Sequence, residues 1–145
     1  MNKKVRIRRI DKAIALPQYK TPGAAGFDFS ARVRTIFPPR TVGYVPLNVA
    51  IEPPEGHFTL LAARSSLHKR GLMSANGLGI IDSDYAGNGD EYTAVLYNFT
   101  DNEVVIEVGE RIMQGVFIPH VHVDWKEVDD MGNANRGGFG TTGKK

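Results

Sequence analysis

The sequence predicts an all-β domain, either a sandwich or a barrel, and three observations lead to this fold class. Short runs rich in β-branched and aromatic residues recur at close intervals along the 145-residue chain. Turn-forming residues separate these runs, and the chain contains 16 glycines and 8 prolines. Only residues 65–71 have the composition of a helical turn, with serines as N-caps and a glycine at the end. Many short strands with little helix are typical of a sandwich or barrel.

The predicted strands follow one another from the N-terminus. Residues 4–8 alternate between basic and apolar side chains, which indicates an edge strand with one face toward the core. The later predicted strands are residues 27–36, 42–51, 57–62, 92–97, 104–108 and 112–123. Turns are expected at residues 38–39, 53–56, 86–90 and 100–102.

The chain is expected to consist of a core and an arm. Residues 1–130 carry the predicted strands and form the expected core domain. Residues 131–145 are rich in Gly, Asn and Thr and have almost nothing to bury apart from Phe139. We therefore expect residues 131–145 to be a mobile C-terminal arm that becomes ordered only against another surface.

The composition excludes several classes of protein. A hydrophobic content of 41% and a charged content of 23% suit one globular domain with a sizeable core. The chain has no cysteine, which excludes a disulfide scaffold, thiol catalysis and a Cys-ligated metal site. The net charge of +2 is too balanced to predict nucleic-acid binding, and no apolar run approaches the roughly 18 residues of a membrane span. No apolar signal core follows the basic start, so we expect a cytoplasmic protein with no nucleic-acid and no membrane partner.

Two segments have residues suited to binding an anion. Arg64, Ser65 and Ser66 place a guanidinium and two hydroxyls at a helix start, although a capped surface turn explains them equally well. Residues 138–145 nearly match a phosphate-binding P-loop, but Lys145 stands where that motif has a hydroxyl and no strand precedes it. These residues can instead form a flap in which Phe139 stacks on a base, and the alternative is a frayed basic terminus.

Acidic residues supply candidates for acid–base chemistry. Asp82 follows an apolar strand end, where partial burial would let it act as a base. Asp82 and Asp84 share a face of an extended chain, so a paired-carboxylate metal site and ordinary turn chemistry both remain open. Asp28 lies inside an apolar strand and is a further candidate. The alternative is an ordinary outward-facing side chain without a chemical role. His120 and His122 share a strand face without a third ligand, which argues against zinc.

Taken in order, five stretches resemble the five motifs of the trimeric dUTP pyrophosphatases (dUTPases), and the resemblance spans nearly the whole chain. The stretches are residues 25–29 (AGFDF), 64–66 (RSS), 79–85 (GIIDSDY), 109–114 (GERIMQ) and 136–143 (RGGFGTTG). The resemblance implies a distorted β jelly roll with one short helix. It also implies a homotrimer with shared active sites, in which each arm closes over a neighbouring subunit's pocket.

The implied reaction is Mg²⁺-dependent hydrolysis of dUTP to dUMP and pyrophosphate, which keeps uracil out of DNA and supplies dUMP for thymidylate synthesis. By this resemblance Asp82 activates the water that attacks the α-phosphorus in line, and Asp28 holds hydrated Mg²⁺ through water. The residues expected to grip the phosphates are Arg64, Ser65, Ser66 and Gln114 in the core, with Arg136, Thr141 and Thr142 in the arm. The residues expected around the nucleoside are Asn76, Gly79, Ile80 and Ile81 in a uracil-reading hairpin, Tyr85 against the deoxyribose, and Phe139 and Gly140 over the base.

The chain departs from the family's pattern at three places. Ser66 stands where the family usually has glycine, and it still offers a backbone donor. Arg136 lies three residues before Phe139, where five is the commoner spacing. Residues 88–91 lengthen the turn that follows the third motif.

Two other functions compete with dUTP hydrolysis as interpretations of the sequence. A dCTP deaminase of the same fold carries a catalytic Glu three residues before the Asn that ends the next strand. The corresponding residue here is Val95, which has no acid–base chemistry. A nucleotide-switched regulatory or interaction protein would also suit a trimer with a closing arm.

Overall fold

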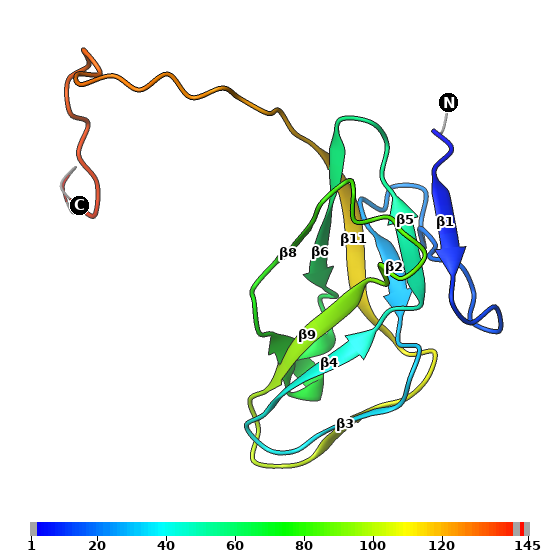
Figure 1. The fold of residues 1–145 in the computed structure, drawn as a ribbon. Helices are drawn as coiled ribbons and strands as arrows, with labels where there is room; N and C mark the ends of the chain where they lie inside the picture. Colours follow the sequence, from blue (N-terminus) through cyan, green and yellow to red (C-terminus); the bar gives the residue numbers. More distant parts are fainter. Residues whose placement is uncertain (1–2, 141–142, 144–145) are drawn as a thin grey trace.

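The computed structural model describes residues 3–140 and 143, and it is almost entirely β-structure (Figure 1). The strands are β1 (Arg6–Arg9), β2 (Phe27–Ser30), β3 (Thr35–Phe37), β4 (Val42–Pro46), β5 (Val49–Glu52), β6 (His57–Ala63), β7 (Leu72–Ser74), β8 (Gly79–Ile81), β9 (Thr93–Asn98), β10 (Val104–Ile106) and β11 (Arg111–Pro119). One 3₁₀-helix, η1 (Leu67–Arg70), follows β6. In the described part of the chain, no helix is long and apolar enough to cross a membrane.

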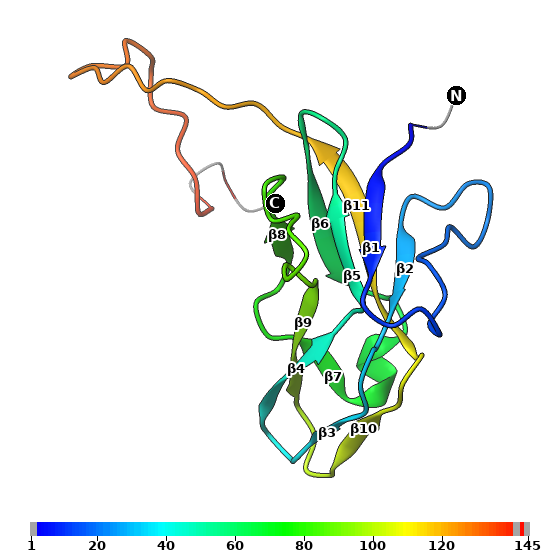
Figure 2. The same cartoon turned by 45° about the vertical axis from the view of Figure 1, so that its right-hand side comes forward.

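Antiparallel pairing arranges the strands in four small sheets. The largest has the order β2–β11–β6–β8, and a second has the order β4–β9–β7. The pairs β1–β5 and β3–β10 complete the set. Figures 1 and 2 show β6 and β11 side by side and the β4–β9 pair crossing below them. Among the described strands β1 pairs only with β5, which agrees with its predicted place at a sheet edge.

The core lies between these sheets and follows the period of two in the strands. In β2, Phe27 and Phe29 are buried while Asp28 faces the other side of the sheet. The rings of Phe27 and Phe29 meet edge to face with centroids 5.3 Å apart, and Tyr92 continues the stack at 5.8 Å from Phe29. The largest fully buried side chains also include Phe37, Leu47, Ile51, Leu72, Leu96 and Ile106. The alternation in β2 therefore fixes the core and aims Asp28 away from it.

Three predicted strands differ from the observed ones. The run 27–36 is divided into β2 and β3, which pair with different neighbours. The run 42–51 is divided at Asn48, whose backbone is left-handed with φ of 71°. The run 112–123 ends at Pro119, because β6 begins at the opposing His57 and offers no further partner. The short strand β7 was not predicted, whereas β8 is the apolar strand end that was expected before Asp82.

The predicted helical turn is present as η1, but its cap differs from the expectation. Ser66 occupies the N-cap position without a side-chain cap hydrogen bond. The end is as predicted, because Gly71 adopts φ of 81°, a conformation that favours glycine, and its amide donates to the carbonyl of His68.

Candidate active site

Asp28 lies between two guanidinium groups on the outer face of the four-stranded sheet. Arg64 Nε lies 3.2 Å from Asp28 Oδ1, and Arg111 Nη1 donates to Asp28 Oδ2 at 2.9 Å. Arg64 also donates to the carbonyl of Arg111 at 3.1 Å. The Asp28 side chain is only 12% exposed, whereas both arginines are more exposed. We call these three side chains the guanidinium cluster; with two cations and one anion, it attracts a negatively charged ligand.

The sheet register places Gln114 beside the guanidinium cluster. Gln114 on β11 lies opposite Asp28 on β2 and donates to the carbonyl of Ala63 at 3.1 Å. A side chain at Gly26 would place its Cβ 2.8 Å from Gln114 Oε1. Glycine at residue 26 therefore leaves room for the amide of Gln114.

Two free backbone donors adjoin the guanidinium cluster. Ser65 and Ser66 follow Arg64 directly and are exposed. Within residues 3–140, neither backbone amide donates a hydrogen bond. The amide of Leu67 closes the turn on the carbonyl of Arg64 at 3.0 Å. Free amides beside two guanidinium groups are suited to phosphate oxygens.

A second group of expected residues surrounds a cavity of about 300 Å³ at the other edge of the sheet. We call it the Asp82 cavity; its lining includes Asn76, Gly79, Ile80, Ile81, Asp82 and Tyr85. Glu91, Tyr92 and Thr93 close its far side. The Asp82 side chain is exposed, and its carbonyl accepts the Tyr85 amide at 3.2 Å, which shapes the turn after β8.

The prediction of a β-hairpin across residues 76–82 is wrong, because the strands on either side of this turn do not pair with each other. β7 pairs with β9, whereas β8 pairs with β6, so the segment between them bridges two sheets. A turn begins at Ser74, whose carbonyl accepts the Gly77 amide at 3.2 Å, and Gly77 has φ of 72°. The described residues form no group of three or more His, Cys, Asp or Glu side chains able to hold a metal, including at Asp82 and Asp84.

The guanidinium cluster and Asp82 lie at opposite ends of β6. Ile81 is opposite Thr59, and Asp82 is the next residue outward from that end. Arg64 lies five residues beyond Thr59 in the other direction. At about 3.4 Å per residue, Asp82 and Arg64 are separated by about 20 Å along the strand direction. One chain therefore holds both groups rigidly but does not bring them together.

The arm is extended and separate from both groups. After Pro119 the chain leaves the sheet and runs away from the core (Figures 1 and 2). The hydrogen bonds found for residues 121–140 all lie within residues 121–143. Arg136 and Gly140 are exposed, and Phe139 is fully exposed with φ of 52°. Thr141 and Thr142 lie outside the described residues.

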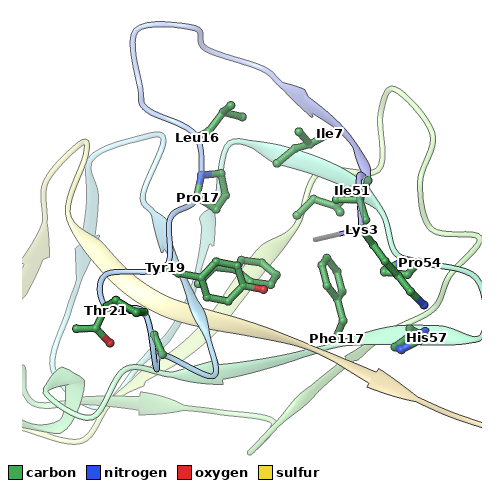
Figure 3. A pocket seen from close by; sticks show the side chains of 14 residues that line it. Lys3, Ile7, Leu16, Pro17, Tyr19, Thr21, Ile51, Pro54, His57 and Phe117 are labelled. Atoms are coloured by element: carbon green, nitrogen blue, oxygen red, sulfur yellow. The ribbon is translucent and has the colours of Figure 1, made fainter. Parts of the chain in front are cut away.

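A cavity larger than the Asp82 cavity contains none of the expected site residues. It measures about 750 Å³ and is lined mainly by apolar side chains, including Ile7, Leu16, Tyr19 and Phe117 (Figure 3). Tyr19 meets Phe27 edge to face at 5.4 Å on one side of this cavity. Its lining lacks the paired charges that mark the guanidinium cluster.

Comparison with known proteins decides the family. The sequence model described as dUTPase matches residues 12–143. This chain belongs to the dUTPase family. A deoxyuridine 5'-triphosphate nucleotidohydrolase from Hydrogenobaculum sp. is 39% identical over 98% of this chain and 99% of its own length. One from Desulfitobacterium hafniense is 40% identical over 97% of this chain and 95% of its own length.

Solved dUTPase structures share the fold. The crystal structure of dUTPase from Streptococcus mutans has a TM-score of 0.74 and 35% identity, covering 82% of this chain and 98% of that one. The dUTPase of Staphylococcus bacteriophage 80alpha, solved with dUPNHPP, has a TM-score of 0.86 at 22% identity and covers 99% and 100% of the two chains. The prediction of an all-β, distorted jelly roll with one short helix is confirmed.

Two residues of this dUTPase-family chain were not predicted from its sequence. Arg111 lies inside the fourth motif, three residues before Gln114, and its place in that motif was the available signal. Glu91 lies in the lengthened turn, where its side chain pairs with Arg32 at 2.6 Å. The other acid of that turn, Asp90, accepts the Gly87 amide at 2.7 Å.

Proposed function

We propose that this dUTPase-family protein hydrolyses dUTP to dUMP and pyrophosphate at sites shared between subunits of a homotrimer. The observation that carries the proposal is the separation of Arg64 from Asp82 by about 20 Å along one strand. An attacking water must lie about 3 Å from phosphorus, and a guanidinium contacts phosphate at about 2.9 Å. The two groups must therefore come within roughly 10 Å of each other, which requires the guanidinium cluster of one subunit beside the Asp82 cavity of another.

The guanidinium cluster has the role of gripping the triphosphate. Arg64 and Arg111 supply positive charge, and the amides of Ser65 and Ser66 supply donors without acceptors in residues 3–140. Asp28 holds both guanidinium groups in place, so the cation pair is oriented before the ligand arrives. Preorganised charge of this kind is the main contribution that proteins make to phosphoryl transfer.

The residues of this site fit Mg²⁺ held through water. Each carboxylate oxygen of Asp28 already has a guanidinium partner and retains capacity for one more hydrogen bond. Its 12% exposure admits a water without stripping the carboxylate of its arginines. A hydrated Mg²⁺ bound to the triphosphate would neutralise charge that develops on the phosphate oxygens.

Asp82 has the role of general base. Its exposed carboxylate accepts a proton from water as the water oxygen bonds to the α-phosphorus. The bond from the α-phosphorus to the bridging oxygen breaks, and pyrophosphate leaves with that electron pair. The arm of a third subunit would bring Arg136 and Phe139 over the bound nucleotide, in the manner that the motif resemblance implies.

The Asp82 cavity has the role of selecting deoxyuridine. Asn76 and residues 79–81 line a space of about 300 Å³, where their backbone groups and the Asn76 side chain would read the base. An exocyclic amino group in place of the uracil oxygen would leave a buried donor opposite a donor, which discriminates strongly. Tyr85 closes the sugar side and excludes a 2′-hydroxyl by contact.

Exposed apolar side chains support assembly. Val42 and Tyr44 on β4 and Met73 on β7 are about half or more exposed on one sheet, and the register places Tyr97 of β9 beside Val42 and Met73. In the segment after β11, Val121, Val123 and Trp125 are also highly exposed. Apolar surface of this kind is typical of subunit interfaces.

A product assay tests the proposed function. Purified protein with Mg²⁺ is offered dUTP, dCTP, dTTP and UTP separately, and pyrophosphate and ammonia are measured. Pyrophosphate is expected from dUTP well above the other three. Ammonia from dCTP would instead support a deaminase, and dUTP binding without pyrophosphate would support a nucleotide-switched protein.

A further inference from the structure

An ion pair outside the guanidinium cluster holds one wall of the Asp82 cavity. Glu91 belongs to the lengthened turn and is one of the residues lining that cavity. Its carboxylate binds Arg32 through two contacts, Nε to Oε1 at 2.6 Å and Nη2 to Oε2 at 2.9 Å. The two side chains are 17% and 28% exposed, so this pair is less solvent-screened than the other arginine–carboxylate pairs outside the guanidinium cluster within residues 3–140.

A third hydrogen bond ties the pair to the protein core. The Asn48 amide donates to Glu91 Oε1 at 2.9 Å. Asn48 is buried, and its own side chain exchanges two hydrogen bonds with the backbone of Asp11, at 2.7 and 2.9 Å. Tyr92, which follows Glu91, is also held in place, because its amide donates to the carbonyl of Val49 at 2.8 Å. The backbone at residue 91 is therefore held from several directions.

That backbone contacts the residue expected to exclude a 2′-hydroxyl. The Tyr85 hydroxyl donates to the carbonyl of Glu91 at 3.4 Å. The Tyr85 residue is 43% exposed, and its hydroxyl bond to Glu91 and its amide bond to the Asp82 carbonyl restrict where its ring lies. A ring that is free to swing would leave space for the extra oxygen of a ribonucleotide.

We propose that the Glu91–Arg32 pair is a positioning device for sugar selection, holding the carbonyl of residue 91 so that Tyr85 stays against the sugar. The Glu91 carboxylate is occupied by Arg32 and the Asn48 amide, so the pair acts on the sugar through Tyr85. The inference rests on the proposed dUTP hydrolysis and adds a determinant of selection between deoxyribose and ribose.

The test compares kcat/KM for dUTP and UTP on the same preparation of each variant. Because both rates scale with the amount of folded enzyme, their ratio is insensitive to partial unfolding. Glu91→Gln is expected to lower the dUTP:UTP ratio about fivefold, the size of one lost neutral hydrogen bond, and Tyr85→Phe by a similar factor. The double variant is expected to lose no more than either single variant, since both changes release the same contact.

A matched control removes an ion pair elsewhere. Asp101→Asn breaks the exposed pair between Asp101 and Arg40, and the ratio should remain that of the parent. If Glu91→Gln is insoluble, Glu91→Asp replaces it, because the shorter acid keeps the charge and loses the reach. Glu91→Asp should also lower the dUTP:UTP ratio of kcat/KM.

The outcomes separate this inference from the proposed function. A parent enzyme that cleaves dUTP, with an unchanged ratio in the Glu91 variants, overturns the positioning role alone. Effects of Glu91→Gln and Tyr85→Phe that multiply in the double variant overturn it as well. A parent enzyme that releases no pyrophosphate from dUTP overturns the proposed function, and the inference with it.

Discussion

Two inactive variants of this protein should restore each other's activity when they share an oligomer. Asp82→Asn removes the proposed base, and Arg64→Ala removes the guanidinium group of a residue whose backbone lies about 20 Å away along β6 in the same chain. If every site takes its base from one subunit and its guanidinium from a neighbour, a mixed oligomer contains some sites with both groups intact.

The size of the recovery follows from this geometry. In an equimolar, randomly mixed population, a site has about a one-half chance of an intact Asp82 and an independent one-half chance of an intact Arg64. About one quarter of the sites are then complete, and the mixture should show about one quarter of parental activity. If each site lay within one chain, no site would be complete and the mixture would be inactive.

The assay is pyrophosphate release after subunit exchange. The two variants are unfolded together in urea, refolded by dilution and assayed with dUTP and Mg²⁺, while native mass spectrometry checks that mixed oligomers form. The matched control mixes parent enzyme with a chain that carries both substitutions. A shared site then gives about one quarter of parental activity, and a site within one chain gives about one half. Mixed oligomers without recovery, together with one half in the control, would refute the shared site.

Four further results are expected. Asp82→Asn should retain dUTP-analogue binding, measured by calorimetry, and lose about 1,000-fold in kcat; near-parental turnover would remove the base from the mechanism. Deleting residues from Arg136 onward should leave the thermal midpoint unchanged and lower kcat/KM by about 100-fold, whereas unfolding would contradict the arm's role. Gly115→Ala places a Cβ 2.7 Å from a Phe29 ring carbon and should cost about 1–3 kcal/mol in urea unfolding, while the Gly23→Ala control, with no atom within 4 Å, should cost little. Burial raises the pKa of Tyr92 above its ordinary value of 10.0, so the parent should lose stability as the pH rises above about 10, and Tyr92→Phe should lose less; equal urea midpoint shifts would contradict this.

The parts of the fold that could be predicted are those that depend on neighbouring residues, such as the alternation of apolar and polar side chains along a strand. Phe27 and Phe29 flank Asp28 in the sequence, and a period of two sends the acid to the opposite face without any knowledge of the rest of the chain. The glycine that ends η1 is local in the same way. Asn48 could have predicted the division of the strand run 42–51, since asparagine is among the few residues that adopt positive φ readily.

The contacts that could not be predicted depend on register between distant strands. Asp28 and Arg64 are 36 positions apart, and nothing near either residue specifies that they form an ion pair. Their meeting requires β11 to lie between β2 and β6 in one particular alignment. The strands β7 and β8 contain three residues each, too few for an alternation of buried and exposed side chains to be recognised. They also pair with different strands, β7 with β9 and β8 with β6.

On the proposed mechanism, the same fixed register explains why one folded chain alone would be an incomplete enzyme. A strand ladder does not stretch, so Arg64 cannot approach Asp82 by a small adjustment without breaking the pairing of β6 with both β8 and β11. A flexible loop could close such a gap, but Arg64 is held by its own pairing with Asp28 and by its backbone bond to Ile112. The rigidity that orients the guanidinium groups is therefore also what prevents them from serving the base in their own chain. It follows that a variant kept monomeric by charged residues on the exposed β4 face should stay folded, keep both groups intact and still fail to turn over dUTP.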